Sequence, residues 1–224
     1  MKNIIFIAPP AAGKGTQSAL INEKYGIPNI SMGALLREYA LKDPMVKEKL
    51  SQGKIIDEHI TLGILEKRLQ ESDCNNGYIL DGFPRTLYQT KAYEDMLKAQ
   101  GKEIGTIIVL DLDKEEAKNR IVGRLSCTKC GTVYNTMFEE MKPKLENVCD
   151  KCGTTLSKRS DDNAEVFEER FQTYLKETAP VIEYLESKYQ VHHVNSGINR
   201  EYTFEQIENV IQKENTTFKQ TKTY

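Results

Sequence analysis

The chain has 224 residues, of which 31 are lysine or arginine and 33 are aspartate or glutamate, so its net charge at pH 7 is −2. This near balance argues against a nucleic-acid-binding face, and no apolar run approaches the ~20 residues that a membrane span needs. A turn at Pro9-Pro10 interrupts the first apolar segment, so no signal peptide is expected there either. We therefore expect a cytoplasmic protein that is large enough to bury a substantial core.

The first expected strand, Asn3–Ile7, runs into a loop of small residues that ends in the sequence Gly13–Thr16. Such a loop, followed by a helix over about Lys14 to Lys24, can hold phosphate, because backbone N–H groups and a helix N-terminus attract anions. The pattern departs from the usual phosphate loop, which has glycine in place of Ala8 and a hydroxyl residue directly after the lysine. An ordinary turn between a strand and a helix is the alternative.

A charged cluster follows the second expected strand, Tyr78–Leu80, and it has the sequence Asp-Gly-Phe-Pro-Arg from Asp81 to Arg85. Ligands of open α/β sheets lie beyond the carboxyl ends of the strands, where this turn would stand beside the phosphate loop. Asp81 could hold a hydrated Mg2+ there, and Arg85 could bind a second phosphate through two hydrogen bonds. A proline turn with a surface ion pair is the alternative.

Two more apolar runs, Thr106–Leu112 and Val191–Val194, are also expected to be strands. The four runs alternate with stretches of helical periodicity, which is the order of a parallel sheet covered by helices. The sequence therefore predicts an α/β fold. Polar residues without apolar periodicity follow Lys213, and they predict a frayed, disordered tail at 214–224.

Four of the five cysteines form two Cys-x-x-Cys pairs that are 18 residues apart, Cys127 with Cys130 and Cys149 with Cys152. This spacing allows two turns to direct four thiolates at one tetrahedral ion, so it predicts a structural zinc site with no open position for catalysis. Redox dithiols or a pair of disulfides are the alternatives. The fifth cysteine, Cys74, is expected to be a small buried apolar side chain.

Arginines stand on both sides of the cysteine-rich segment, with Arg120 and Arg124 before it and Arg159 and Arg170 after it. We expect a helix over 115–124, on which Arg120 and Arg124 share a face, and another that begins near Asp162. For any one of these arginines, a solvated surface ion pair is the alternative. Their position at both ends of an insertion favours a hinged lid, which needs charges that meet only on closure.

Together these motifs resemble the adenylate kinases, specifically their long form with a zinc-bearing lid. The resemblance spans Asn3 to about Ile211; it rests on the two loops above, Gln89, the sequence Arg-Ile-Val-Gly-Arg at 120–124, the cysteine pairs, and Arg159–Asp162 followed by Arg170. It implies a P-loop fold with a five-stranded parallel sheet flanked by helices, an AMP-side helical subdomain and an inserted zinc-binding lid.

The resemblance also implies boundaries within the chain. The core would comprise residues 1–29, 61–124 and 161–213, the subdomain that binds the nucleoside monophosphate would be 30–60, and the lid would be 125–160. A monomer is expected, because one chain would carry the whole reaction.

The implied reaction is reversible phosphoryl transfer from MgATP to AMP, giving two ADP. The implied catalytic residues are Lys14, Asp81, Arg85, Arg120, Arg124, Arg159 and Arg170. ATP would contact Gly13, Lys14, Gly15, Thr16, Arg120, Arg124 and Gly197. AMP would contact Met32, Arg37, Ile56, Gly82, Arg85, Gln89, Arg159 and Arg170. In these sets Arg37 and Arg85 would hold the AMP phosphate and Gln89 the adenine, while Asp161 would help to position the closed lid.

Several positions depart from the family's usual residues. Relatives usually have glycine in place of Ala8 and Ala11, threonine in place of Met32, and aspartate in place of Ala34 and Glu58. If either loop alanine has positive φ, it costs about 1–2 kcal/mol. Three alternatives therefore stay open: a kinase for another nucleoside monophosphate, a weakly active nucleotide-sensing relic, and a zinc-ribbon adaptor.

Overall fold

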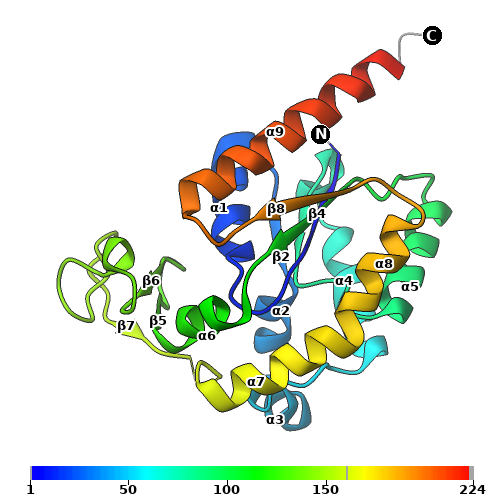
Figure 1. Ribbon diagram of the computed structural model, residues 1–224. Helices are drawn as coiled ribbons and strands as arrows, with labels where there is room; N and C mark the ends of the chain where they lie inside the picture. The colour runs from blue at the N-terminus through cyan, green and yellow to red at the C-terminus, as the bar shows by residue number, and fades with distance from the viewer. Residues whose placement is uncertain (1, 160, 222–224) are drawn as a thin grey trace.

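The structure is a computed structural model that describes residues 2–159 and 161–221. Its centre is a five-stranded parallel sheet with the strand order β2-β3-β1-β4-β8, and helices cover both faces of this sheet (Figure 1). The α/β fold predicted from the sequence is confirmed. The strands are β1 Ile4–Ile7, β2 Asn29–Ser31, β3 Ile79–Asp81, β4 Thr106–Asp111 and β8 Val191–Asn195.

The apolar pattern predicted four of these strands and missed β2. This strand has three residues, of which only Ile30 is apolar, so it carries too little pattern to be recognised alone. The strand is formed by its pairing with β3, which is parallel and extends over the whole length of β2.

The strand register brings the ends of β1, β2 and β3 to one edge of the sheet. Phe6 of β1 lies opposite Asp81 of β3, and Asp81 in turn lies opposite Ser31 of β2. Because parallel strands point the same way, the segments that follow them open on the same side. The loop after β1 and the turn after β3 are therefore neighbours.

Alternate side chains of the strands build a core on each face of the sheet. Ile5 and Ile7 of β1 belong to one buried cluster, together with Tyr93 and Leu185. Ile4 and Phe6 belong to another, which includes side chains of α1 and α9. The sheet is thus buried on both sides, which explains why its strands read as continuous apolar runs.

Nine α-helices lie within the described ranges: α1 Lys14–Tyr25, α2 Met32–Tyr39, α3 Pro44–Ser51, α4 Glu58–Leu69, α5 Leu87–Ala99, α6 Lys114–Val122, α7 Ala164–Thr173, α8 Ala179–Glu186 and α9 Arg200–Thr221. Side-chain caps explain several of their starts, since Asp57, Thr86 and Asp113 accept backbone N–H groups of α4, α5 and α6. Over the same ranges, no helix has both the length and the apolarity of a membrane span.

Three short helical segments complete the helical part of the described chain: η1 Ser72–Asn76, η2 Glu139–Met141 and η3 Tyr174–Thr178. The third of these is a π-helical segment that joins α7 directly to α8. Such segments widen a helix locally and are frequent at functional sites.

The helix expected over 115–124 ends earlier than predicted. α6 stops at Val122, and Arg124 is the first residue of strand β5, Arg124–Cys127. Between them Gly123 packs closely against the chain, since a Cβ there would lie only 2.6 Å from Cγ of Met137. Arg120 and Arg124 therefore do not share a helix face, and this prediction was wrong.

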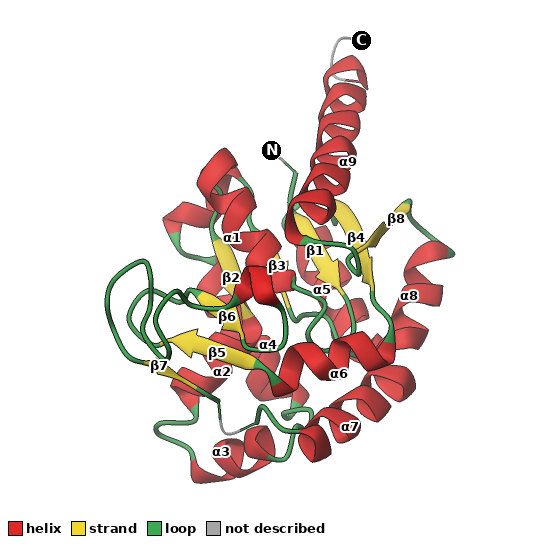
Figure 2. Cartoon of the chain, turned by 60° about the vertical axis from the view of Figure 1, so that its left-hand side comes forward, coloured by secondary structure: helices red, strands yellow, loops and turns green. Residues whose placement is uncertain are grey.

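The cysteine-rich segment forms a second, antiparallel sheet in the order β6-β5-β7, with β6 at Val133–Asn135 and β7 at Leu156–Ser157. Figure 2 shows this small sheet beside α6, apart from the central sheet. Only a few of its side chains are buried, among them Tyr134 and Leu156. So small a core needs another source of stability, and the cysteines supply the ligands for one.

The C-terminal segment differs from its prediction as well. We expected disorder from residue 214, but α9 continues to Thr221, and residues 222–224 lie outside the described range. No glycine or proline follows Arg200 to stop the helix. In addition, Glu214 accepts a hydrogen bond from Lys2 at 3.4 Å and contacts His192 at 3.2 Å, which ties this part of α9 to the sheet.

Candidate functional site

The loop between β1 and α1 has the backbone geometry of an anion site. Gly13 at the N-terminus of α1 has φ +85°, which glycine adopts at no steric cost. Of the two loop alanines, Ala11 has a positive φ of +64° and Ala8 does not. The expected conformational cost therefore applies to Ala11 alone.

Lys14 is the first residue of α1, and among the described residues it forms no ion pair with a carboxylate. Its Nζ donates to the carbonyl oxygens of Ala8 and Pro9, both at 3.3 Å. The pKa of Lys14 is lowered to about 8, mainly by burial and in part by the nearby guanidinium groups of Arg85, Arg170 and Arg124, while the Asp81 carboxylate opposes the shift. A buried ammonium among guanidinium groups favours an anionic ligand.

Asp81 stands at the end of β3, beside the first turn of α1. A Cβ added at Gly15 would lie 3.6 Å from Oδ2 of Asp81. Within the described parts of the chain, no hydrogen bond engages this carboxylate. It is thus available to the water shell of a cation that accompanies phosphate, so the residues present fit Mg2+.

Arg85 is fixed by its own turn and by η3. Its Nε donates to the carbonyl of Gly82 at 2.9 Å, and its backbone N–H donates to Oε1 of Gln89 at 2.8 Å. Its carbonyl accepts a hydrogen bond from Oγ1 of Thr178 at 2.9 Å. Burial lowers the pKa of Arg85, with Asp81 opposing the change and Arg37 adding to it. The guanidinium is thereby held next to Arg37 without being neutralised.

A pocket opens beside this turn, between α2, α4, α5 and α7. Seven of the eight residues expected to contact AMP line it: Met32, Arg37, Ile56, Gly82, Arg85, Gln89 and Arg170. Arg159 does not line this pocket. One wall of the pocket is apolar because Met32, Leu36 and Ile56 line it.

The pocket continues under the phosphate loop. A second cavity is lined by Lys14, Pro84 and Tyr174, and it shares Arg85 and Arg170 with the first. On the opposite side the loop at Gly53 rests on α7, since a Cβ at Gly53 would lie 2.6 Å from Cγ of Arg170. The cavity on the monophosphate side and the cavity under the phosphate loop therefore adjoin each other, with Arg85 and Arg170 lining both.

Three arginines from the two ends of the lid and from α7 carry further positive charge near this space, and two of them pair with carboxylates. Arg124 donates from Nε to Oδ2 of Asp162 at 2.7 Å, and Arg170 donates from Nη1 to Oδ2 of Asp161 at 2.9 Å. The pKa of Arg170 is lowered to about 10, mainly by burial and in part by Arg85, while Asp161 opposes the shift. For Arg159, burial lowers the pKa, and Arg124 and Arg37 add to the effect.

Cationic side chains thus outnumber carboxylates around this space. The cations are Lys14, Arg37, Lys54, Arg85, Arg124, Arg159 and Arg170, and the carboxylates that act on them are Asp81, Asp161 and Asp162. Positive charge that is partly shielded from water and only partly compensated is an electrostatic complement to several phosphate groups.

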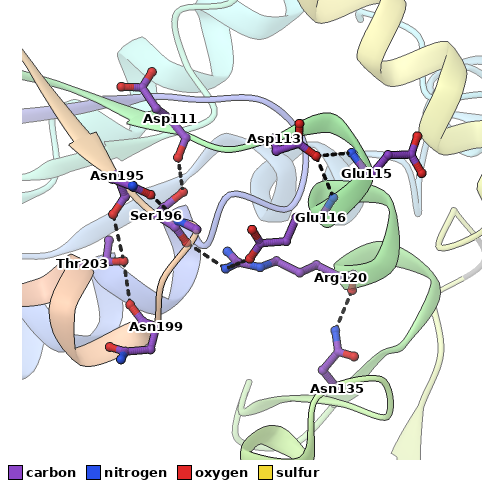
Figure 3. A network of polar contacts seen from close by, with 11 residues as sticks. Asp111, Asp113, Glu115, Glu116, Arg120, Asn135, Asn195, Ser196, Asn199 and Thr203 are labelled. Carbon is purple, nitrogen blue, oxygen red and sulfur yellow. Dashed lines mark hydrogen bonds and ion pairs between the residues drawn. The ribbon is translucent and has the colours of Figure 1, made fainter.

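Arg120 lies at a different place, at the carboxyl ends of β4 and β8 (Figure 3). Its Nη2 donates to Oε1 of Glu116 at 2.5 Å and to the carbonyl of Ser196 at 2.8 Å. Gly197 follows directly, and its N–H donates to Oδ1 of Asn195 at 2.8 Å. The structure therefore brings Arg120 and Gly197 together, and Arg120 is not among the residues that line the two cavities.

The four predicted cysteine ligands meet at one point. Their Sγ atoms all lie within 4.8 Å of one another. Contacts of 3.4 Å join Cys127 to Cys152, and contacts of 3.5 Å join Cys130 to both Cys149 and Cys152. Bonds of ~2.3 Å to a tetrahedral Zn2+ place sulfur atoms about 3.8 Å apart, so the arrangement fits this ion.

The two cysteine turns have the same backbone pattern, which explains how they meet. Gly131 donates to the carbonyl of Cys127, and Gly153 donates to the carbonyl of Cys149. The N–H groups of these same two cysteines donate to the residue after each glycine, Thr132 and Thr154. Cys74 is buried away from the cluster, as predicted.

Sequence reasoning missed some residues that line the two cavities. Lys54 lines the first, and Tyr174 and Thr178 line the second. Tyr174 and Thr178 belong to η3, and nothing in the sequence marks a π-helical segment. Lys54 directly follows Gly53, and a lysine beside a glycine turn is a pattern that could have predicted a phosphate contact.

Comparison with known proteins agrees with this geometry. A sequence model described as adenylate kinase matches residues 6–190. The chain is 41% identical over 215 residues to an adenylate kinase of Archaeoglobus fulgidus, covering 94% of this chain and 98% of the relative. It is 41% identical over 213 residues to one of Allorhizobium ampelinum, with coverages of 93% and 98%. A third, of Thermosipho africanus, is 38% identical over 215 residues, with coverages of 94% and 100%.

Proposed function

Since the chain belongs to the adenylate kinase family, we propose that its phosphate loop binds ATP, its pocket binds AMP, and the arginines between them stabilise the phosphoryl group in transfer. The protein is a nucleoside monophosphate kinase that transfers a phosphoryl group reversibly from MgATP to AMP, giving two ADP. The observation that supports these residue roles best is the excess of cations over carboxylates around two adjoining cavities.

On the donor side, the N–H groups of Gly13, Gly15 and Thr16 bind the ATP phosphates, and Lys14 reaches the outer ones. Arg120 and Gly197 bind the base and lie together at the ends of β4 and β8. Mg2+ supplies charge that offsets the phosphates when it binds with ATP, and Asp81 would hold its water shell.

On the acceptor side, Arg37 and Arg85 bind the AMP phosphate. Gln89 contacts the adenine, while Gly82, Met32 and Ile56 form the wall around it. Because the Arg85 turn is fixed by three hydrogen bonds, its guanidinium keeps its place when the pocket is empty. The acceptor site therefore loses little freedom on binding.

Transfer itself needs no covalent nucleophile. The transition state of phosphoryl transfer is loose and spreads charge over its oxygens, so catalysis depends on alignment and on cations. Lys14, Arg124, Arg159 and Arg170 supply those cations between the two phosphate positions. An arginine placed in this way is worth about 10³–10⁵ in rate. Closure of the lid over ATP excludes water, which would otherwise accept the phosphoryl group.

We also propose that the four cysteines hold Zn2+, that residues 30–60 and 125–160 move relative to the core, and that the protein acts as a cytoplasmic monomer. Support for the metal comes from the sulfur geometry and from the two matching turns. The ion would have a structural role, because four thiolates leave no position for a substrate.

The test is ADP formation from MgATP with AMP, CMP, UMP or GMP offered in turn, with the Arg124→Ala variant as the control for contaminating kinase. We expect rapid turnover with AMP and little with the other three. Faster turnover with another base would identify a kinase for that monophosphate and would point to Met32 as its cause. Tight ATP binding without any turnover would instead indicate a nucleotide-sensing relic.

A further inference from the structure

A chain of hydrogen bonds leads from α4 to the acceptor pocket. Oγ1 of Thr86 donates to Oε1 of Glu58 at 2.6 Å, although the two residues are 28 positions apart. The same Oγ1 accepts the backbone N–H of Gln89 at 3.2 Å. Oε1 of Gln89 then accepts the backbone N–H of Arg85 at 2.8 Å. We call these four residues the acceptor relay.

The relay fixes which end of the Gln89 amide faces the pocket. Its oxygen is occupied by the N–H of Arg85. Gln89 lines the pocket, and among the described residues its Nε2 neither has a hydrogen-bond partner nor is fully enclosed. The NH2 group is therefore the end that is free to meet a ligand, and it is a donor only.

A donor at this place distinguishes between bases. Adenine offers a ring nitrogen that accepts on its pairing edge, whereas guanine and uracil offer an N–H there. If the amide turned over, its oxygen would face the pocket and would lose the N–H of Arg85. The orientation of one amide thus decides between an acceptor-bearing and a donor-bearing base.

Thr86 is the only link between Gln89 and Glu58 in the relay. It is 8% exposed and caps the N-terminus of α5, so it sets where the first turn of that helix stands. Glu58 is the first residue of α4, directly after the segment 30–57 that carries Met32 and Arg37. The Glu58–Thr86 bond therefore ties the root of that segment to the helix that carries Gln89.

We propose that Glu58 and Thr86 are positioning residues of the acceptor site, which hold the Gln89 NH2 group toward the base and the Arg85 turn toward the phosphate, and so make the site selective for adenine. This inference rests on the proposed function, because it assigns AMP to the pocket. Neither residue is among those that line the pocket. Both act through Gln89, so their loss weakens AMP binding and leaves ATP binding intact.

The test compares steady-state kinetics and AMP binding by titration calorimetry for the parent chain and four variants: Thr86→Val, Thr86→Ser, Glu58→Leu and Glu58→Gln. Thr86→Val removes both bonds of the hydroxyl group without a change in size. It should raise the KM for AMP about tenfold, the equivalent of about 1.4 kcal/mol, and change kcat and the KM for ATP less than twofold. The ratio of kcat/KM for AMP to kcat/KM for GMP should become smaller. Glu58→Leu should raise the KM for AMP about threefold.

The conservative variants separate positioning from simple stability. Thr86→Ser keeps the hydroxyl and Glu58→Gln keeps an acceptor oxygen, so both should retain the parent KM for AMP. Thr90→Val is the matched control, because it removes a buried hydroxyl whose one partner in the described part of the chain is the carbonyl of Thr86, at 2.8 Å and one turn along the same helix. It should lower the melting temperature as much as Thr86→Val does and leave the KM for AMP unchanged.

The inference is overturned if Thr86→Val and Thr90→Val change the KM for AMP equally, or if KM for ATP rises as much as that for AMP. Failure of the proposed function looks different. A parent chain that binds AMP without turning it over would overturn the kinase assignment. The calorimetric comparison of AMP binding would still show whether Glu58 and Thr86 position Gln89. A parent chain that neither binds nor turns over AMP would overturn both.

Discussion

Arg124 and Asp162 join the two ends of the lid through a double hydrogen bond, from Nε to Oδ2 at 2.7 Å and from Nη2 to Oδ1. Arg124 opens the strand that leaves the core, and Asp162 precedes the helix that returns to it. The Asp162 side chain is fully buried, at 0% exposed, so this carboxylate has no access to water. The pair fixes the base of the lid, and its two hydrogen bonds hold the Arg124 guanidinium in one orientation.

Asp162→Ala should destabilise the protein strongly, because it leaves a mostly buried guanidinium without its partner. Loss of one member of a buried pair costs about 3 kcal/mol, which corresponds to a fall of about 6–12 °C in melting temperature for a chain of this size. Differential scanning calorimetry measures this change. Glu139→Ala is the control, since Glu139 pairs with Lys142 on the surface and is 85% exposed; equal melting temperatures for the two variants would contradict the prediction.

Ala11→Gly should stabilise the protein. At φ +64° the alanine Cβ is strained by about 1–2 kcal/mol, and the added freedom of glycine in the unfolded chain offsets part of the gain. The free energy of unfolding should therefore rise by about 0.5–1 kcal/mol in urea titrations. Ala12→Gly serves as the control, because Ala12 is buried without a positive φ and its loss should destabilise by about 1 kcal/mol. A lower free energy of unfolding for Ala11→Gly than for the parent chain would contradict this prediction.

Some features of this site follow from local sequence, and these were predicted correctly. The cysteine cluster is one, because each Cys-x-x-Cys turn places its own two ligands and the spacing leaves room for the turns to meet. The order of the first strand, the small-residue loop and the first helix is another, because the three follow one another along the chain.

Features that depend on distant contacts could not be predicted. Arg124 was placed on a helix because residues 115–124 have helical character, whereas contacts of Gly123 with the lid end that helix two residues earlier. The bond between Glu58 and Thr86 joins residues that only the fold brings together. The extension of α9 depends on Glu214 meeting Lys2 and His192 from the other end of the chain and from β8.

The pH dependence of catalysis should report Lys14. Its pKa of about 8 in the free protein lies below the ordinary value of 10.5, because burial disfavours the charged form. As the pH rises above about 8, Lys14 loses its proton in the ATP-free protein. The value of kcat/KM for ATP should then fall about tenfold per pH unit. The kcat profile should stay flat to higher pH, because bound phosphate favours the charged form.

The same shift affects stability in the opposite direction. Between pH 8 and 10.5 the unfolded chain binds a proton at Lys14 that the folded chain does not, so the contribution of Lys14 makes the ligand-free protein more stable as the pH rises through this window. Lys14→Met removes the titrating group and should abolish both effects. If kcat/KM for ATP in the parent chain stayed constant up to pH 10, Lys14 would not be the titrating group.

Loss of the metal should loosen the lid and spare the phosphate loop. Cys127→Ser removes one of four thiolates, and we expect metal content by mass spectrometry to fall well below one ion per chain and the melting temperature to drop. A chelator should have the same effect on the parent chain. Cys74→Ala is the control, because Cys74 lies outside the cluster. A melting temperature that a chelator does not change would contradict a structural metal.

The π-helical segment between α7 and α8 sets the angular relation of the residues on either side of it. In a regular α-helix, Arg170 and Thr178 would point about 80° apart, because each residue advances by about 100°. One extra residue in a wider turn subtracts about 100°, so the two side chains differ by only about 20° and line the same cavity. Thr178 therefore reaches the Arg85 carbonyl from a helix that also carries Arg170. Deletion of a single residue from 174–178 would restore an ideal helix and turn one of the two contacts away from the substrate.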